Sequence, residues 1–380
     1  MSQRSLRVAV SAHLLHGEAG YRSAGIHTYI EQTLRHLPEA DPALRLTVFT
    51  RHPPADLPPS VEVRGTRWPT ERPPLRILWE QLRLPLAARR GRADVLHATA
   101  FAAPIVRLSP TLVTIYDLSF ALFPAYFRGF NQRYLRAATR FSARHARRII
   151  VISEHTRRDV HQLYGVPLDR IDVAYPGVDE ALRPAEPEAV ARFRREKNLP
   201  DKFLLFLGTL EPRKNLVTLI NAFTEMKRDC PTATLVLAGG VGWKFDDLFA
   251  AIDSSGVKDS VVLSGYIKAE EKALWLSSAA AFVYPSVYEG FGLPPLEAMA
   301  CGTPVLTSDA ASLPEVVGEA GLTIAPDDVL GWAHALRRVW RDDAYRAELR
   351  ERGLQQAQKF TWLAAAHCIA ASYHRAMEQS

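Results

Sequence analysis

The sequence has 380 residues, of which 47% are apolar and 23% charged, so it can fill the cores of two globular domains and lacks the bias of a disordered chain. Three cysteines without metal-ligand spacing, Cys230, Cys301 and Cys368, argue against a disulfide framework and favour a reducing compartment. The net charge of +6 divides into +9 over residues 1–180 and −3 over residues 181–380, which predicts different partners for the two halves.

No segment of the sequence predicts export or a membrane span. Residues 6–10 are apolar but too few for the core of a signal peptide. The longest uncharged run, residues 273–288, contains a proline and falls short of the roughly 18 apolar residues of a membrane helix. We therefore expect a cytoplasmic protein.

The chain begins with a predicted strand, a glycine loop and a helix. Residues 6–12 read as the strand, the loop passes through Gly17, Gly20 and Gly25, and residues 26–37 have amphipathic helical spacing. A loop after the first strand of a parallel sheet is a ligand position. Because G-x-G-x-x-G is missing, plain turn roles are the simpler interpretation of Gly17 and Gly20.

The next elements continue the alternation of strands and helices. Strands are predicted at residues 45–50, 61–64, 93–97, 111–116 and 148–153, with helices at 75–90, 127–149 and 154–164. His97 ends one strand, where a contact with an acceptor substrate and a buried structural role fit equally well. Asp117 ends another, which suits an acceptor contact or the ordering of a loop.

Arginines recur every three or four residues along the helix predicted at residues 127–149. These residues are Arg133, Arg136, Arg140, Arg144 and Arg147, and a helix would place them in one stripe. A solvated helix face is the commonest explanation of such a stripe. The sharper hypothesis is peripheral contact with anionic lipid headgroups or with a pyrophosphate-linked acceptor at a membrane surface.

A domain boundary is expected near residue 180, with the proline-containing residues 180–200 as linker and entry to a second unit. Strands of this unit are predicted at residues 203–207, 234–238, 261–263, 280–284, 304–307 and 322–324. Helices follow over residues 327–360 and 361–377. Alternating elements of this kind predict a second doubly wound parallel sheet.

Two loops of the second half carry the residues most typical of a ligand site. Gly208 opens residues 208–215, which bring Arg213 and Lys214 to the carboxyl end of a strand, where they can neutralise a departing diphosphate. The loop with Glu289 leaves another strand, and we expect the two loops to face each other across the sheet ends.

The Glu289 loop leads into a predicted helix. Gly290 and Gly292 suit tight turns, and Pro294 and Pro295 fit only the first helical turn, where we also place Glu297. The start of such a helix offers free N–H groups to a phosphate. Taken singly, Glu289 is explained as a solvated loop charge and Glu297 as an acid that complements the helix dipole.

The segment from Glu289 through Gly-Phe-Gly-Leu to Glu297 resembles the donor-binding signature of family 4 retaining glycosyltransferases, mannosyltransferase-like branch. Residues 211–215, Glu-Pro-Arg-Lys-Asn, resemble the phosphate-contacting segment of the same family. The resemblance implies the GT-B fold, an α/β architecture of two facing doubly wound Rossmann-like domains with a cleft between them. Residues 1–180 would form the acceptor side and residues 181–360 the donor side, with the helix at 361–380 returning to the first domain.

The resemblance also implies roles for individual residues. Glu289 would bind hydroxyls of the donor sugar, and Glu297 would accept a hydrogen bond from the ribose. Phe291, Gly292 and Leu293 would offer backbone N–H groups, and Gly25 would lie beside the diphosphate.

The sequence departs from the family pattern at two positions. Tyr116 stands before Asp117 where family members carry histidine, and His27 stands where a second glycine is frequent. These departures leave the local chemistry around Asp117 and Gly25 open.

The resulting expectation is a metal-independent, retaining hexosyltransferase without a cofactor. No Asp-x-Asp triplet occurs, and Arg213 and Lys214 can neutralise the diphosphate in place of a metal ion. GDP-mannose is the first expectation for the donor and a UDP-hexose the second, with a saccharide or lipid-linked acceptor. Glu289→Ala is expected to abolish turnover with little loss of fold, and Arg213→Ala to slow nucleotide departure.

Three other functions remain as alternatives. A nucleotide-sugar epimerase needs the same diphosphate site, and a glycoside hydrolase would use Glu289 and Glu297 as its carboxylate pair. A nucleic-acid-binding protein would use the arginine stripe, but it lacks interleaved aromatic residues, and we expect no nucleic-acid partner.

Overall fold

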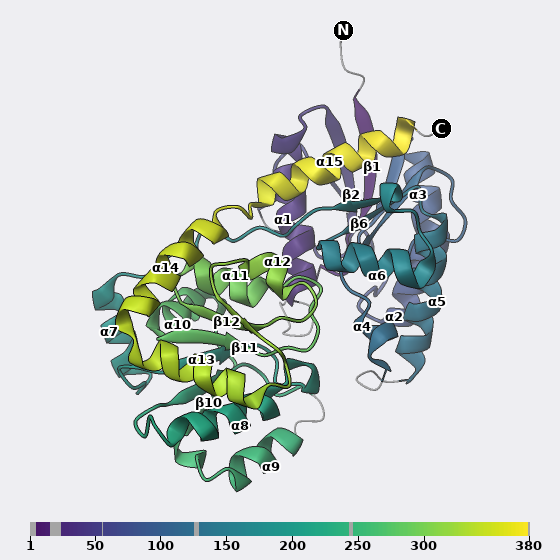
Figure 1. Ribbon diagram of the computed structural model, residues 1–380. Helices are drawn as coiled ribbons and strands as arrows, with labels where there is room; N and C mark the ends of the chain where they lie inside the picture. The colour runs from purple at the N-terminus through teal and green to yellow at the C-terminus, as the bar shows by residue number, and fades with distance from the viewer. Residues whose placement is uncertain (1–4, 16–23, 55, 125–128, 243–245, 379–380) are drawn as a thin grey trace. The chain divides into compact units, whose positions relative to one another are not determined.

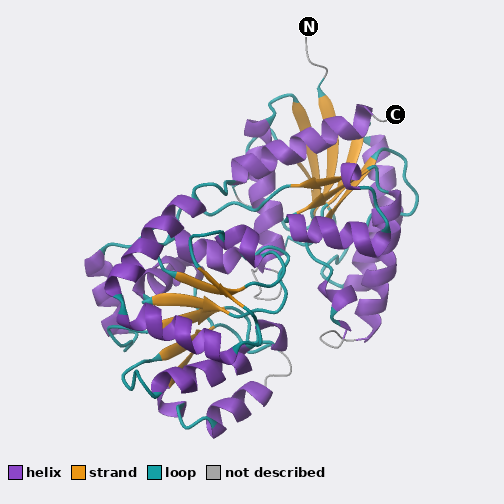
Figure 2. Cartoon of the chain, viewed as in Figure 1, coloured by secondary structure: helices purple, strands orange, loops and turns teal. Residues whose placement is uncertain are grey.

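The computed structural model of the chain contains two α/β units, each built around its own parallel sheet with helices packed on it (Figures 1 and 2). The structure describes residues 5–15, 24–54, 56–124, 129–242 and 246–378, so Gly17 and Gly20 lie outside the described residues. The first unit comprises residues 1–177 and 361–380, and the second comprises residues 178–360.

The described part of the first unit forms a seven-stranded sheet in the order β3-β2-β1-β4-β5-β6-β7. Its strands are β1 (Leu6–Ser11), β2 (Leu44–Thr50), β3 (Glu62–Gly65), β4 (Val95–Ala98), β5 (Thr111–Ile115), β6 (Arg148–Val151) and β7 (Ile171–Val173). Its helices include α1 (Ala24–Ala40), α2 (Pro73–Leu78), α3 (Leu84–Arg90), α4 (Ser119–Leu122), α5 (Gly129–His145), α6 (Glu154–Tyr164) and α15 (Trp362–Glu378). Figure 1 shows α15 running beside α1 on this sheet, and the two helices are in contact.

The described part of the second unit forms a six-stranded sheet in the order β10-β9-β8-β11-β12-β13. Its strands are β8 (Leu204–Leu207), β9 (Leu235–Ala238), β10 (Val261–Gly265), β11 (Ala281–Tyr284), β12 (Val305–Ser308) and β13 (Leu322–Ile324). Its helices include α7 (Pro187–Glu196), α8 (Leu216–Lys227), α9 (Asp246–Ser254), α10 (Lys272–Ser278), α11 (Leu293–Ala300), α12 (Leu313–Val317), α13 (Val329–Arg341) and α14 (Asp343–Ala357).

Both sheets have the doubly wound topology that the alternating sequence pattern predicts. The central strands β8, β9, β11 and β12 are buried along their whole length, and the first three have the continuous apolar sequences typical of such strands. Strand order reverses between β1 and β4 in the first unit and between β8 and β11 in the second. Open parallel sheets bind ligands beyond the carboxyl ends of their strands at such switch points, so each unit offers one ligand position.

Three local predictions were wrong or incomplete. The helix expected at residues 75–90 is interrupted by a π-helical turn, Trp79–Arg83, in which Leu84 donates to the carbonyl of Trp79. Pro85 has no N–H to continue the α-helical ladder at this point. The linker expected at residues 180–200 contains α7, because Pro187 occupies the first helical position, where a missing N–H costs nothing. The short α4 and β7 were not predicted.

No helix in the described ranges is long and apolar enough to cross a bilayer.

Candidate functional site

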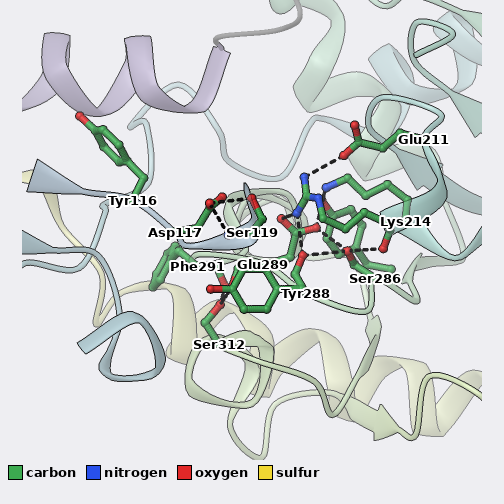
Figure 3. Close-up of polar contacts among 12 residues, drawn as sticks. Tyr116, Asp117, Ser119, Glu211, Lys214, Ser286, Tyr288, Glu289, Phe291 and Ser312 are labelled. Atoms are coloured by element: carbon green, nitrogen blue, oxygen red, sulfur yellow. Dashed lines mark hydrogen bonds and ion pairs between the residues drawn. The ribbon is translucent and has the colours of Figure 1, made fainter. Parts of the chain in front are cut away.

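A cluster of polar side chains occupies the switch point of the second unit (Figure 3). This Glu289 cluster consists of Glu211, Arg213, Lys214, Tyr284, Ser286 and Glu289. β8 leads into residues 208–215 and β11 into residues 285–292, and the two strands are paired neighbours. The structure therefore brings together the two loops that the sequence places opposite each other.

The first loop is shaped by a tight turn before α8. Residues Pro212–Lys214 form a single 3₁₀ turn, and Asn215 follows it in the left-handed conformation with φ of 56°. The amide Nδ2 of Asn215 donates to the carbonyl of Pro326 at 2.7 Å, which fixes this unusual backbone. The turn directs Arg213 and Lys214 toward the neighbouring loop.

Glu289 is the shared acceptor of the cluster. Its Oε1 accepts from Nζ of Lys214 and Oγ of Ser286, both at 2.5 Å, and its Oε2 accepts from Arg213 at 2.8 Å. Only 8% of the residue is exposed. Burial by itself raises the pKa of Glu289, but the charges of Arg213 and Lys214 and the hydrogen bonds outweigh it and lower the pKa to about 2. The carboxylate is therefore ionised at neutral pH.

Both cations are already bound to carboxylates. Arg213 lies between Glu289 and Glu211, at 2.8 Å from each, and also donates to the carbonyl of Tyr288 at 2.6 Å. Lys214 is 6% exposed and donates to the hydroxyl of Tyr284. Burial and the charge of Arg213 lower the pKa of Lys214, while Glu289 opposes the shift.

Glu211, Tyr284 and Ser286 are members of the cluster that were not predicted as site residues. Glu211 had a signal, because it is the acid of the Glu-Pro-Arg-Lys-Asn segment and stands two positions before Arg213. Tyr284 and Ser286 flank Pro285 at the end of β11 and have no signal apart from that place.

The backbone after Glu289 turns into α11 at Gly292. This residue has φ of 122° and precedes the helix directly, and a Cβ added there would lie 2.8 Å from Leu313 Cδ2. Oγ of Ser312 donates to the carbonyls of Glu289 and Phe291 at 2.9 and 2.7 Å, which holds the loop on α12. Pro294 and Pro295 stand in the first turn, as expected.

Glu297 lies one turn further along α11 than predicted, because the helix begins at Leu293 and leaves no acid in its first turn. Its Oε1 accepts from Nζ of Lys272 on α10 at 2.8 Å. Glu289 and Glu297 therefore have separate partners, and Glu289 lacks the raised pKa of a general acid, so the arrangement gives no support to a glycoside hydrolase.

The predicted site residues of the first unit have structural partners of their own. Oδ1 of Asp117 accepts from N and Oγ of Ser119 at 3.0 and 2.7 Å, which orders the turn after β5 (Figure 3). Tyr116, which replaces the family histidine, is buried and donates its hydroxyl to the carbonyl of Thr99 at 2.7 Å. Burial and the neighbouring Tyr29 raise its pKa well above the ordinary value, so Tyr116 offers no titratable group near neutral pH.

His97 is a buried structural histidine. It is 2% exposed, and its Nδ1 and Nε2 lie 2.8 Å from the hydroxyls of Tyr373 and Thr114. Burial lowers its pKa to about 3, so the ring is neutral. Gly25 is exposed in the first turn of α1, and the neighbouring His27 pairs with Glu31 at 3.5 Å.

The arginine stripe follows α5 as predicted. Arg133, Arg136, Arg140 and Arg144 are exposed on this helix, while Arg147 lies beyond its end and is half-buried. Nε of Arg144 donates to the carbonyl of Tyr164 at 3.2 Å.

Comparison with known proteins finds family matches over both units. A model described as Glycosyltransferase Family 4 matches residues 23–182, and one described as Glycosyl transferases group 1 matches residues 188–356. The O-antigen chain mannosyltransferase B of Escherichia coli is 33% identical over 278 residues, which are 73% of this chain and 73% of that protein. The serotype-specific mannosyltransferase WbdA of Escherichia coli is 30% identical over 259 residues. These are 66% of this chain but only 31% of WbdA.

A solved structure extends the likeness to the whole fold. The sucrose-phosphate synthase of Thermosynechococcus elongatus superposes with a TM-score of 0.74 at 22% sequence identity, covering 99% of this chain and 100% of that one.

Proposed function

The chain belongs to family 4 of the glycosyltransferases, and from this premise we propose that it moves a hexosyl group from a nucleoside-diphosphate sugar to a hydroxyl of a saccharide or lipid-linked acceptor. We assign it retention of the anomeric configuration and no requirement for a metal ion or a cofactor. The observation that carries the proposal is Glu289, a buried and ionised carboxylate held by two cations at the switch point of the second unit.

In the donor complex, Glu289 would accept hydrogen bonds from hydroxyls of the transferred sugar. Its low pKa keeps it ionised at neutral pH, so it can accept hydrogen bonds but is a poor proton carrier, which suits binding and positioning better than acid or base chemistry. Backbone N–H groups of residues 291–293 at the start of α11 would bind the diphosphate or the sugar. Gly208 and Gly290 would let the donor approach the backbone of the two loops. Glu297 would share its carboxylate between Lys272 and the ribose.

The proposed reaction exchanges one bond to the anomeric carbon for another. The bond to the diphosphate oxygen breaks, and the acceptor hydroxyl forms a new bond on the same face of the sugar. The hydroxyl proton passes to the departing diphosphate, so neither Glu289 nor another side chain has to carry it. Asp117, held by Ser119 at the carboxyl end of β5, would lie on the acceptor side.

Arg213 and Lys214 would stabilise the negative charge that grows on the leaving diphosphate, in place of a metal ion. Because both already bind carboxylates, their electrostatic field is the main contribution, and Arg213 also keeps Glu289 in place. Activity that survives an excess of EDTA after dialysis is the expected result. Loss of activity on chelation, restored by Mg²⁺ or Mn²⁺, would contradict this part of the proposal.

GDP-mannose is the proposed donor, supported by the two Escherichia coli relatives, whose names state mannosyl transfer. A thermal-shift panel of GDP-mannose, UDP-glucose, UDP-galactose and their free diphosphates tests it, because a bound donor raises the melting temperature. A larger shift with a UDP-sugar would replace the proposed donor and leave the reaction class intact.

Product analysis tests the reaction itself. The transferase is expected to release nucleoside diphosphate in step with glycoside formation, and the coupling constant of the new anomeric proton reports retention. A changed sugar without release of nucleotide would instead identify the epimerase, which neither of the two mannosyltransferase relatives described above supports.

The exposed arginines of α5 support a proposed peripheral contact with an anionic membrane surface, where a lipid-linked acceptor would be presented. Salt-sensitive pelleting with vesicles containing phosphatidylglycerol, but not with phosphatidylcholine alone, is the expected outcome. Oligonucleotide binding of equal strength would point to nonspecific charge attraction instead.

A further inference from the structure

The switch point of the first unit, between β1 and β4, holds a polar cluster that the donor chemistry does not use. This His13 cluster consists of His13, Arg76, Glu80 and Tyr134. His13 lies in the turn that follows β1, Glu80 in the π-helical turn and Tyr134 in the first half of α5. All four are therefore supplied by segments at or near the carboxyl edge of the sheet, where doubly wound units bind ligands.

His13 is buried without a hydrogen-bond partner. It is 3% exposed and packs edge-on against Trp79 with ring centroids 4.1 Å apart. Neither Nδ1 nor Nε2 finds a partner among the residues that the structure describes. Burial, assisted by the charge of Arg76, lowers the pKa of His13 to about 4, so the ring is neutral and offers one donor and one acceptor.

Glu80 and Tyr134 add two oxygen atoms to the same place. Oε1 of Glu80 lies 4.0 Å from Nε of Arg76, a distance at which the ion pair is loose. The hydroxyl of Tyr134 is buried and has no partner within the described ranges. Burial raises the pKa of Glu80 to about 7, against the opposing charge of Arg76. Burial and the charge of Glu80 together raise the pKa of Tyr134 to about 12.

Unpaired buried polar atoms reduce the stability of a folded protein, because each loses its hydrogen bonds to water and forms none within the fold. The π-helical turn that carries Trp79 and Glu80 is itself a costly distortion that recurs at functional sites. A ligand that forms hydrogen bonds with the unpaired atoms would explain both observations at this switch point, the two unsatisfied side chains and the distorted helix.

We propose that the His13 cluster binds hydroxyl groups of the acceptor and selects a neutral saccharide at this position over a phosphate. The inference rests on the proposed transferase function. It adds where the acceptor binds and which chemical groups of the acceptor are recognised. A neutral imidazole, a phenol and a carboxyl group can each donate to or accept from sugar hydroxyls, and the edge of Trp79 adds apolar contact. A phosphate in the same place would meet the carboxyl group of Glu80, which repels an anion once ionised, and one loosely paired arginine.

Conservative changes test the assignment, because the polar atoms that they remove have no hydrogen-bond partner in the described structure. Tyr134→Phe removes only the unpaired hydroxyl, and His13→Phe keeps the ring against Trp79. The matched control is Tyr164→Phe, since the hydroxyl of Tyr164 is also buried and unpaired but belongs to the last residue of α6, outside the His13 cluster. None of the three changes is expected to lower the unfolding temperature by more than a degree or two.

Saccharide binding to the full-length protein is then measured by saturation-transfer NMR. The probes are methyl α-D-mannopyranoside, methyl β-D-glucopyranoside and α-mannobiose, with mannose 6-phosphate as the anionic counterpart. Tyr134→Phe and His13→Phe are each expected to weaken the best neutral probe about 3- to 10-fold, the worth of one hydrogen bond, and Tyr164→Phe to leave it unchanged. Mannose 6-phosphate is expected to bind less well than its neutral analogue.

The proposal is wrong if no neutral probe binds the wild type, if the two cluster variants bind as the wild type does, or if the control weakens binding equally. Tighter binding of mannose 6-phosphate would overturn the saccharide class. Thermal shifts with GDP and UDP, measured on the same samples, report the donor site separately. A wild type that binds a saccharide but neither nucleotide would contradict the proposed function and leave the His13 cluster as a saccharide site.

Discussion

At the scale of single residues, the carboxylate of Glu289 supports both turnover and stability, because it is the shared partner of two buried cations. This changes the expectation for Glu289→Ala, which leaves Arg213 and Lys214 without their common partner. We predict a loss of about 3–5 kcal/mol in the free energy of unfolding together with the loss of turnover. Urea unfolding of Glu289→Ala and Glu289→Gln, beside initial rates, measures both effects. Wild-type stability in Glu289→Ala would show that the buried contacts are not formed in solution.

The low pKa of Glu289 gives a second prediction, which concerns acid stability. The folded state lowers this pKa from its ordinary value of 4.5 to about 2, so the folded protein binds the proton less readily than the unfolded chain. The stabilisation is therefore complete above pH 4.5 and is lost as the pH falls toward 2. We expect the wild type to lose about 3 kcal/mol more than Glu289→Gln across this window. Parallel acid titrations of unfolding free energy would reject the idea if the two curves have the same shape.

Glu211 is predicted to position the site without touching the substrate. Glu211→Gln keeps an acceptor for Arg213 but removes the charge that balances it. We expect kcat to fall about 10-fold with little change in the KM of the donor, because a charged hydrogen bond becomes a neutral one. Glu62→Gln is the control, since Glu62 pairs with Arg64 at the exposed edge of the first unit. Equal effects of the two substitutions would argue against a positioning role.

The sequence predicts those site residues whose chemical type and position after a strand can both be recognised in it. Arg213, Lys214 and Glu289 each follow the end of a central strand, so their meeting could be inferred from the alternation of elements alone. The hydrogen-bond partners of the loop could not be inferred in this way. The bond from Ser312 to the carbonyl of Glu289, for example, depends on how α12 packs. His97 shows the converse, since only the packing of α15 reveals that both of its nitrogens are satisfied.

At the scale of secondary-structure elements, the start of α11 depends on Gly292. Gly292→Ala would place a side chain on a residue with a φ of 122°, which L-residues rarely adopt, and against Leu313, so we predict a cost of roughly 1–3 kcal/mol and loss of donor binding. Gly165→Ala is the matched control, because Gly165 has φ of 69° after α6 and an added Cβ would meet nothing within 4 Å. It should cost about 1 kcal/mol and leave nucleotide thermal shifts unchanged. Normal donor binding in Gly292→Ala would contradict the proposed role of this turn.

Elements with long apolar runs or strong periodicity could be predicted from the sequence, and elements defined by a single proline could not. β8 and β11 stand out as buried strands, and α6 matches its predicted bounds because Ser153 caps it and Gly165 ends it. Proline was misleading in two opposite ways. Pro187 starts a helix where a linker was expected, and Pro85 distorts one that was expected to be regular.

At the scale of the whole molecule, the end of the chain is attached to the first unit by ionic contacts. Asp172 on β7 accepts from Arg148 at 2.6 Å and from Ser372 and Arg375 of α15 at 2.7 Å. We predict that Asp172→Ala destabilises the first unit by about 3 kcal/mol and separates unfolding into two transitions. Added donor nucleotide should raise only the transition of the second unit.

The control for this prediction is Asp41→Ala, which removes a half-exposed contact to His374 on the same helix and should have a small effect. A single transition that shifts as a whole in Asp172→Ala would mean that the two units unfold together.

The route of the chain also has a consequence for its synthesis. Residues 1–177 leave the ribosome before residues 178–360, and α15 leaves after both. This helix packs Trp362 on Tyr29 and places the hydroxyl of Tyr373 2.8 Å from Nδ1 of His97. The first unit therefore cannot complete its folding until α15 has emerged, whereas residues 178–360 can fold as soon as they emerge. A chain that stalls or stops before α15 would present an uncovered apolar surface, which chaperones and proteases recognise. Only a chain translated through α15 can bury that surface.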